Sequence, residues 1–246
     1  MKIRAAAHVH SDWSHDGSWP LPRIASCFKI AGYNCVLTSE HDESFTHDRW
    51  QSYRKACSEN STDTFLFVPG IEYSDPLNIV HVLVWGDLPF LGAGRETGAL
   101  LREANEFQGV TVLAHPSRRN AWQKHESQWG PFLSGVEQWN RKVDGVAPGP
   151  EAIALLKQSP GLLPFAGLDF HRANQFFPLS MAGQSEGRLI EEEVLNGLRE
   201  KKIRAKVAGV SIDYFSKGAL YKAVKGLEKF RQYLRRIIKG QTKRTE

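Results

Sequence analysis

The feature that most constrains the fold lies in residues 3–17, where an apolar run leads into His8 and His10 and then a polar turn that ends at Asp16 and Gly17. Side chains two positions apart on a β-strand share a face, so the two imidazoles are expected to point the same way. At the carboxyl end of a strand in an α/β protein, such a pair lies over a pocket. The pair therefore indicates metal binding, and two packed or solvated histidines are the simpler alternative.

Metal-ligand residue types recur at the ends of, or within, other predicted strands. Residues 35–38 precede His41, 64–68 precede Glu72, 79–85 contain His81, 110–113 precede His115, and 162–168 precede Asp169 and His171. Further strands are predicted at 135–139 and 203–207, and helices at 20–32, 47–58, 95–107, 150–158, 189–201 and 217–239. Strand and helix alternate roughly seven times, which predicts an α/β fold with a parallel barrel formed by one domain, residues 1–246.

The ligand types gathered at these positions favour a site for more than one metal ion. The candidates are His8, His10, Asp16, His41, Glu72, His81, His115, Asp169 and His171, and they include six of the nine histidines in the chain. Imidazole and carboxylate without thiolate suit zinc, manganese or iron. The three cysteines show no CxxC spacing, so neither a disulfide framework nor a thiolate site is expected. Nine groups exceed the needs of one ion, so we expect two or three divalent ions that share a carboxylate.

Six motifs, HVHSDWSHDG, TSEHD, GIEYS, VHVLVWG, AHP and GLDFH, resemble in this order those of the PHP (polymerase and histidinol phosphatase) family and cover residues 8–171. The resemblance implies a distorted seven-stranded (β/α)7 TIM-like barrel, three metals and phosphoester hydrolysis. By this resemblance the first metal is held by His8, His10, Glu72 and Asp169, the second by Glu72, His81 and His115, and the third by Asp16, His41 and His171. His15 is also a ligand type, but relatives place the ligand just before the glycine. SEHD departs from the single aspartate that many relatives have before the histidine.

Such a site is expected to hydrolyse a phosphomonoester or phosphodiester with a metal-bridged hydroxide, because paired metals activate water and neutralise phosphoryl oxygens. Cationic side chains stabilise the charge of the transition state. The candidates for this catalytic role are Arg118, Arg119 and Arg172, and solvent-facing loop arginines are the alternative for each. Glu137 and Asn140 are expected to orient a ligand or to cap a helix.

Two other functions compete with this one. An amidohydrolase-type metallohydrolase also begins with HxH, but it brings a carboxylated lysine from a middle strand, and no lysine stands at a predicted strand end here. A metal-stabilised binding or accessory module without catalysis is expected to have lost ligands, and no loss is visible. The substrate is expected to be a small phosphorylated molecule, a nucleotide or a short oligonucleotide.

The positive charge of the chain is concentrated near its end. Residues 216–246 hold ten of the 32 Lys and Arg residues but only two of the 27 Asp and Glu residues. An apolar stripe from Leu220 to Ile238 predicts a helix that packs on the barrel, with a solvated basic side and a tail. A stable nucleic-acid complex is therefore not expected. There is no long apolar run and no leader-like N-terminus, so a cytoplasmic protein without a membrane partner is expected.

Overall fold

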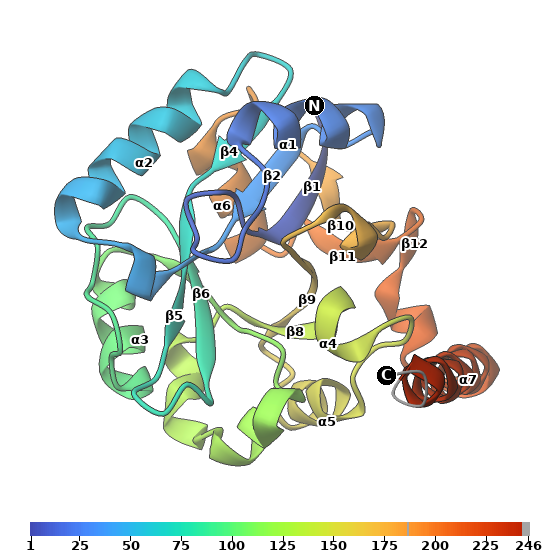
Figure 1. Ribbon diagram of the computed structural model, residues 1–246. Helices are drawn as coiled ribbons and strands as arrows, with labels where there is room; N and C mark the ends of the chain where they lie inside the picture. Colours follow the sequence, from blue (N-terminus) through green and yellow to red (C-terminus); the bar gives the residue numbers. More distant parts are fainter. Residues whose placement is uncertain (186, 243–246) are drawn as a thin grey trace.

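The chain forms a mixed α/β structure in which helices surround one large sheet (Figure 1). The computed structural model describes residues 1–185 and 187–242. The strands are β1 (Lys2–Val9), β2 (Cys35–Thr38), β3 (Glu40–His41), β4 (Leu66–Val68), β5 (Gly70–Ser74), β6 (His81–Trp85), β7 (Val110–Leu113), β8 (Gly135–Asn140), β9 (Leu163–Phe170), β10 (Leu179–Gln184), β11 (Arg204–Val207) and β12 (Val210–Ser211). The helices are α1 (Leu21–Ile30), α2 (His47–Glu59), α3 (Thr97–Glu106), α4 (Arg141–Asp144), α5 (Pro150–Gln158), α6 (Glu191–Arg199) and α7 (Gly218–Thr242).

The sheet contains parallel and antiparallel pairs. Its order is β12-β11-β10-β1-β9-β8-β7-β6-β5-β3, and β2 pairs with β1 and with β4. Parallel pairing joins β9 to β1 and β8, β8 to β7, and β2 to β1 and β4, which agrees with the predicted crossovers. The carboxyl ends of these parallel strands therefore point in one direction and can present their side chains to one site.

The expectation of a wholly parallel arrangement is wrong at β6. This strand runs antiparallel to both β5 and β7, with Ser74 opposite His81. Only a short turn joins β5 to β6, in which the Asp75 carboxylate accepts hydrogen bonds from the backbone N–H groups of Ile79 and Val80. A parallel return needs a crossover of a dozen or more residues, so this connection permits only a hairpin.

The sheet also extends beyond the predicted strands. The segment Leu179–Gln184, where no strand was predicted, forms β10, which pairs antiparallel with β1 and with β11. Burial explains the pairing, because Leu179 and Met181 are fully buried on its inner face. Apolar side chains from β1, α1, α2 and the middle strands form the core, with Phe28, Tyr53, Trp85 and Phe165 almost wholly enclosed.

The predicted packing of the C-terminal helix is wrong. Leu227 and Phe230 on α7 are 60% and 59% exposed, whereas Glu228 is 3% exposed. The Glu228 carboxylate accepts hydrogen bonds from the backbone N–H of Val146 and from the Arg231 guanidinium, and it lies against Gly145, where a Cβ atom would clash with it. The helix is therefore attached through a polar contact at α4, and its apolar stripe faces away. Of the predicted tail, residues 243–246 lie outside the described residues. No helix in the described ranges is long and apolar enough to cross a membrane.

Candidate metal centre

The nine predicted ligands converge at the ends of the strands, but regular strand alternation does not bring them there. His8, His115 and Asp169 have φ values of 58°, 25° and 49°, in the left-handed region that side chains with a Cβ atom rarely adopt. The ladder register shifts between Ala7 and Val9 in both pairings of β1, so a bulge re-aims His8. His8 and His10 therefore face one site because the strand is locally distorted. The expectation that residues two apart share a face of the strand predicted their proximity correctly, but it did not include this distortion.

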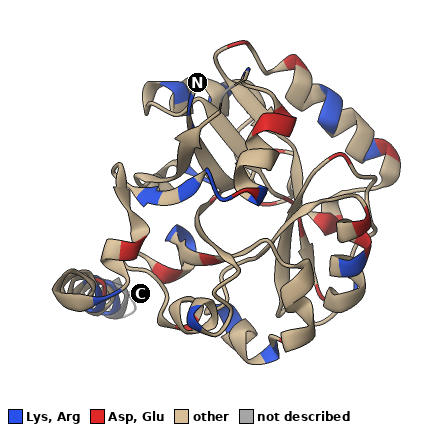
Figure 2. Cartoon of the chain, turned by 180° about the vertical axis from the view of Figure 1, so that it is seen from behind, with Lys and Arg blue, Asp and Glu red and all other residues tan. Residues whose placement is uncertain are grey.

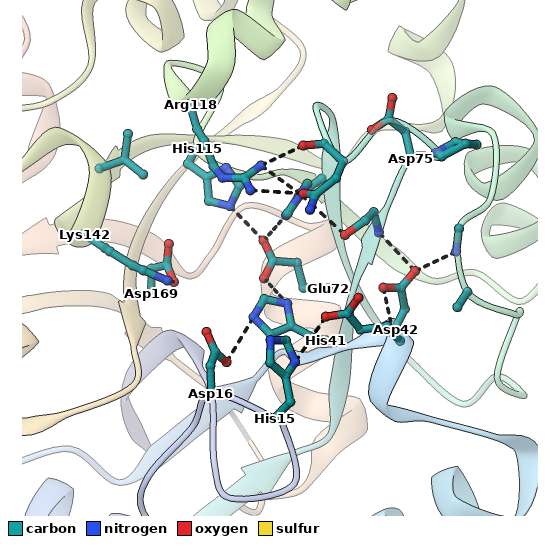
Figure 3. Close-up of a pocket in the computed structure, with 18 residues that line it drawn as sticks. His15, Asp16, His41, Asp42, Glu72, Asp75, His115, Arg118, Lys142 and Asp169 are labelled. Atoms are coloured by element: carbon teal, nitrogen blue, oxygen red, sulfur yellow. Dashed lines mark hydrogen bonds and ion pairs between the residues drawn. The ribbon is translucent and has the colours of Figure 1, made fainter.

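Glu72 lies at the centre of the cluster (Figure 3). Its Oε2 is 3.4 Å from His8 Nε2, 3.4 Å from His10 Nε2 and 3.2 Å from His41 Nδ1. Its Oε1 is 2.7 Å from His81 Nδ1 and 2.8 Å from His115 Nε2. The two oxygens of one carboxylate thus face two different sets of imidazoles, which is the arrangement a carboxylate shared by two cations requires.

A second set surrounds Asp16. Its two oxygens lie 3.3 Å from His41 Nε2 and 3.0 Å from His171 Nε2. His10 stacks on His171 with ring centroids 4.1 Å apart, and its ring nitrogen completes a four-residue ligand group with these three. His15 instead points toward Glu43, 3.2 Å away, and its side chain is 56% exposed. The structure therefore places Asp16, and not His15, among the converging ligands.

Glu137 and Asn140 hold the ligands from behind. Glu137 accepts a hydrogen bond of 2.8 Å from His8 Nδ1 and another of 2.8 Å from the backbone N–H of His115. Asn140 donates to Glu137 and caps α4 by accepting from the backbone N–H of Val143. Gly167 leaves the space that Glu137 occupies, because a Cβ atom there would overlap its carboxylate. The predicted capping role of Asn140 is confirmed. The contacts of Glu137 are those expected of a residue that orients a ligand.

The charges of the cluster compensate one another. Burial disfavours the protonated form of His8, but the nearby carboxylates of Glu137, Glu72 and Asp169 outweigh it and raise its pKa well above the usual value. Burial and the neighbouring His171 and His41 lower the pKa of His10 well below the usual value. Burial alone would raise the pKa of Glu72, but the adjacent imidazoles hold it well below its ordinary range. The centre is thus an ionised carboxylate among imidazoles of unequal basicity.

The donor atoms fit divalent cations. His8 Nε2, His10 Nε2 and Asp16 Oδ1 are buried and have no hydrogen-bond partner among the described residues. Three groups of side chains have ligand atoms within 4.8 Å of one another: His10, Asp16, His41 and His171; His8, Glu72 and His115; and His8, His10 and Asp169. Buried polar atoms without partners are costly, and cations bound by these lone pairs would remove that cost. His8 Nδ1 is hydrogen-bonded to Glu137, so Nε2 is the ring nitrogen whose lone pair can bind a metal, as in many metal sites.

Lys142 is a residue of the site that the sequence prediction missed. Its Nζ is 3.1 Å from Asp169 Oδ1 and 3.3 Å from His171 Nε2. It stands on α4, a helix of four residues, directly after β8. A short helix carries no apolar periodicity, so no pattern marked Lys142. Its position two residues beyond Asn140, at a strand exit, is the one signal that was available.

The three arginines proposed as catalytic occupy different surroundings. Arg118 lies at the wall of the centre, with Nη1 3.0 Å from His81 Nε2 and Nη2 3.0 Å from Asn78 Oδ1. Arg119 bonds the backbone oxygen of Asn78 and is exposed. Arg172 lies on the far side of His171, in a neighbouring cavity. Of the three arginines, Arg118 therefore contacts a proposed metal ligand through its side chain. Arg119 and Arg172 have no such side-chain contact among the described residues.

A cavity of about 620 Å³ opens above the cluster, and we call it the metal cavity. Its lining includes Asp16, His41, Glu72, His81, His115 and Asp169, together with Arg118 and Lys142 (Figure 3). Six acidic residues and only two Lys or Arg side chains line it. Such a cavity repels a free anion unless cations are bound, so its electrostatics also favour metal binding.

Comparison with known proteins shows the fold. No family model matches the chain, and no curated protein matches its sequence. A two-domain protein from Bacteroides vulgatus containing a predicted PHP-like metal-dependent phosphoesterase aligns with a TM-score of 0.59 and 18% identity over 84% of this chain and 65% of that one. The chain has a PHP-like fold. It spans about two thirds of the Bacteroides protein, so PHP-like describes the fold and not the activity of this chain.

Two further solved structures share the fold of this chain. PsfC from Pseudomonas syringae aligns with a TM-score of 0.63 and 15% identity over 95% of this chain and 99% of that one. The lesion-specific endonuclease PfuEndoQ from Pyrococcus furiosus aligns with a TM-score of 0.61 and 16% identity over 83% of this chain and 58% of that one. The three alignments therefore show a shared fold over most of this chain.

Proposed function

We propose that the protein is a metal-dependent phosphoesterase that hydrolyses a phosphomonoester or phosphodiester. The observation that carries the proposal is Glu72, whose two carboxylate oxygens face imidazoles on opposite sides at 2.7–3.4 Å. The PHP-like fold and the buried ligand groups support it. Two or three zinc, manganese or iron ions would be held, because imidazole and carboxylate donors suit these metals.

The proposed division of ligands follows the sequence resemblance with one addition. His8, His10, Glu72 and Asp169 would hold the first ion, and Glu72, His81 and His115 the second. Asp16, His41 and His171 would hold the third, with His10 adjoining this group as well. When bound, the ions would make hydroxide available at neutral pH and neutralise phosphoryl oxygens.

The side chains around the ions would bind and orient the ester. Asn78 fixes the Arg118 guanidinium at the wall of the metal cavity, so it can donate to a phosphoryl oxygen without a large loss of side-chain freedom. Lys142 offers an ammonium beside Asp169 and is 41% exposed, which lets it turn toward an anion in the cavity. Both cations would stabilise the charge that spreads over the phosphoryl oxygens in the transition state.

We also infer that the strands close into the distorted seven-stranded barrel implied by the motifs. Only Ser39 separates β2 from β3, and only Pro69 separates β4 from β5, so each pair continues one strand. Counted in this way, the pairings run from β1 through β2/β3, β4/β5, β6, β7, β8 and β9 and back to β1. A closed barrel would hold all the strand ends around one mouth.

One observation keeps the amidohydrolase-type alternative in view, since Lys142 reaches a ligand carboxylate. It comes from α4 rather than from a strand, and it is partly exposed, which favours a role with the substrate over one as a carboxylated ligand. Intact-mass measurement under bicarbonate would detect a carboxylated lysine. Hydrolysis of amides or lactones without any hydrolysis of phosphate esters would replace the proposed function by this alternative.

The deciding experiment combines metal analysis with two chromogenic esters, p-nitrophenyl phosphate and bis(p-nitrophenyl) phosphate. Purified protein should contain transition metal, lose hydrolysis after chelation, and regain it with Mn²⁺ or Zn²⁺ but not with Ca²⁺. The ratio of the two rates then tells monoesterase from diesterase. Folded protein that stays active in excess chelator and contains no stoichiometric metal would refute the proposal.

A further inference from the structure

A second cavity, of about 640 Å³, adjoins the metal cavity, and we call it the basic cavity. The two cavities share Asp16 and Lys142 in their walls. The charged side chains that line the basic cavity are Arg141, Lys142, Arg172, Arg231 and Arg235, with Asp16 as the only carboxylate. Five cations therefore line the same cavity as His171 and Asp16, two of the proposed ligands of the third metal.

Few of these cations are neutralised within the protein. Arg231 is paired with Glu228 at 2.6 Å, and Lys142 with Asp169 at 3.1 Å. Across the described ranges, no carboxylate lies within 4.0 Å of the side-chain nitrogens of Arg141, Arg172 or Arg235. A group of like charges held together without counterions is unfavourable, and a bound anion relieves it.

Arg141 has a buried hydrogen-bond donor without an acceptor, which is a second and independent indication that this cavity binds a ligand. Its guanidinium lies 4.9 Å from the centre of the Phe177 ring, which fixes its position. Its Nε is buried and has no hydrogen-bond partner among the residues that the structure describes. Burial, followed by the nearby Arg231, lowers the pKa of this guanidinium. A buried donor without an acceptor is rare in folded proteins, so Arg141 is poised to donate to a ligand.

The basic cavity depends on α7. Glu228 anchors this helix at Val146, and Gly145 leaves room for the anchor. The contact turns Arg231 and Arg235 toward α4 and leaves Leu227 exposed. Figure 2 shows Lys and Arg residues on α7. The polar attachment, which the apolar pattern did not predict, thus serves to place two cations at the edge of the metal centre.

We propose that the basic cavity binds a second phosphate group of the substrate, separate from the ester that is hydrolysed. The proposal deepens the proposed function and rests on it. Arginine forks match phosphate oxygens, and a wall shared through Asp16 and Lys142 puts both phosphates within reach of one molecule. The substrate class is therefore a multiply phosphorylated molecule, either a small bisphosphate or a nucleic-acid strand with an adjacent backbone phosphate.

A series of bisphosphates of increasing length, assayed with metal-loaded full-length protein, tests whether a second phosphate is bound. Bisphosphates of linear alkanediols, from propanediol to hexanediol, are compared with the monophosphates of the same alcohols. For at least one length, kcat/KM should exceed that of the monophosphate by about tenfold or more, because charge-assisted hydrogen bonds to the second phosphate are gained. A dinucleotide with one phosphate and a trinucleotide with two form a parallel pair. A preference confined to the trinucleotide would support the cavity and assign the second phosphate to a nucleic-acid backbone.

Matched variants on the same helix locate the effect. Arg235→Gln removes a lining cation, whereas Arg236→Gln removes an exposed neighbour that does not line the cavity. The preference for two phosphates over one should fall about tenfold in Arg235→Gln and in Arg172→Gln. Arg236→Gln should keep the wild-type preference and the wild-type rates. Circular dichroism of the variants excludes loss of the fold as the cause.

The outcomes separate this proposal from the one on which it rests. If monophosphates are hydrolysed but no bisphosphate or trinucleotide is preferred, or if Arg235→Gln keeps the preference, the second-phosphate site is wrong and the phosphoesterase stands. If no ester is hydrolysed, the proposed function fails. Isothermal titration calorimetry with butanediol bisphosphate then tests whether the basic cavity binds phosphate, independently of hydrolysis. Wild-type protein should bind this probe about tenfold more tightly than Arg235→Gln, and equal affinities would overturn the site.

Discussion

The metal cavity and the basic cavity are neighbours of nearly equal volume, about 620 and 640 Å³, but they are built in different ways. Strand ends and their bulges position the proposed ligands at the first cavity, and most of these ligand side chains are buried. A four-residue helix, a loop and one face of α7 form the second. Strand ends fix side chains through the sheet ladder, whereas α4 and α7 are held by a few polar contacts. The difference suggests that the first cavity performs the reaction and the second selects what reacts.

The largest effect is expected from a substitution in the metal cavity that removes bound metal, because the basic cavity is not proposed to hold a metal. Glu72→Gln keeps the shape of the side chain but removes the charge that faces five imidazoles. We expect kcat/KM to fall by about a thousandfold or more, and bound metal to fall with it, because a shared ligand is lost. Inductively coupled plasma mass spectrometry and ester hydrolysis measure both. Glu106→Gln, a change at an exposed residue of α3 that does not line the metal cavity, serves as the control and should alter neither. Normal metal content in Glu72→Gln would end the bridging role.

Lys142 stands in the wall between the cavities, so its removal should affect the reaction without emptying the metal sites. For Lys142→Gln we expect kcat/KM to fall by about a hundredfold for any ester, since one donor to the transition state is lost. Metal content should stay at the wild-type level, in contrast to Glu72→Gln. Lys157→Gln, an exposed change on α5, is the control. A parallel loss of metal would make Lys142 a ligand or a structural group instead.

Asp144 lies at the end of α4, the helix that carries Lys142, and it should make the stability of the protein depend on pH. Burial raises the pKa of its carboxyl group to about 7. A carboxyl pKa that is higher in the folded than in the unfolded state contributes stability below the unfolded value and loses it as pH rises to the folded value. From pH 4 to 7, the free energy of unfolding of Asp144→Asn minus that of wild type should therefore rise, by about 3 kcal/mol. Urea denaturation across this range measures the difference. A flat or falling difference would show that Asp144 is ionised in the folded protein.

The smallest expected effect tests how α7 is attached. Leu227→Ala should change the free energy of unfolding by less than about 0.5 kcal/mol, because the side chain is 60% exposed. The same substitution at Leu198, which is 1% exposed on α6, should cost about 2–5 kcal/mol. Equal losses in chemical denaturation would mean that the apolar stripe is covered in solution and that the polar attachment is not the main one.

The sequence predicted the metal cavity far better than the basic cavity, for a physical reason. Ligands such as His115 and Asp169 follow short β-branched or apolar runs, so their place at strand ends could be seen locally. The direction of β6 was missed because the prediction used the apolar runs alone. The short connection between Glu72 and Ile79, which is visible in the sequence, already permits only a hairpin. The bulge at His8 also left no mark in the alternating pattern.

The basic cavity depends on contacts between distant segments. Arg141 and Arg235 meet only because Glu228 docks beside Gly145, more than eighty positions away in the chain. The periodicity of α7 correctly predicted a helix, but its apolar stripe suggested the wrong docking face. A buried glutamate flanked by leucine and lysine has no signature that distinguishes it from a solvated one. The second cavity therefore became visible only once the chain was folded.

The left-handed backbone at His8, His115 and Asp169 has a consequence for how the sequence can vary. Glycine adopts such angles without the penalty of a Cβ atom, which is about 1–3 kcal/mol for a residue held there. The backbone at each of these sites would thus be more relaxed with glycine, which has no side chain to bind a metal. Laboratory selection for thermal tolerance alone should drift toward glycine at these positions and lose the ions. The most stable version of this chain and its working version are therefore different sequences.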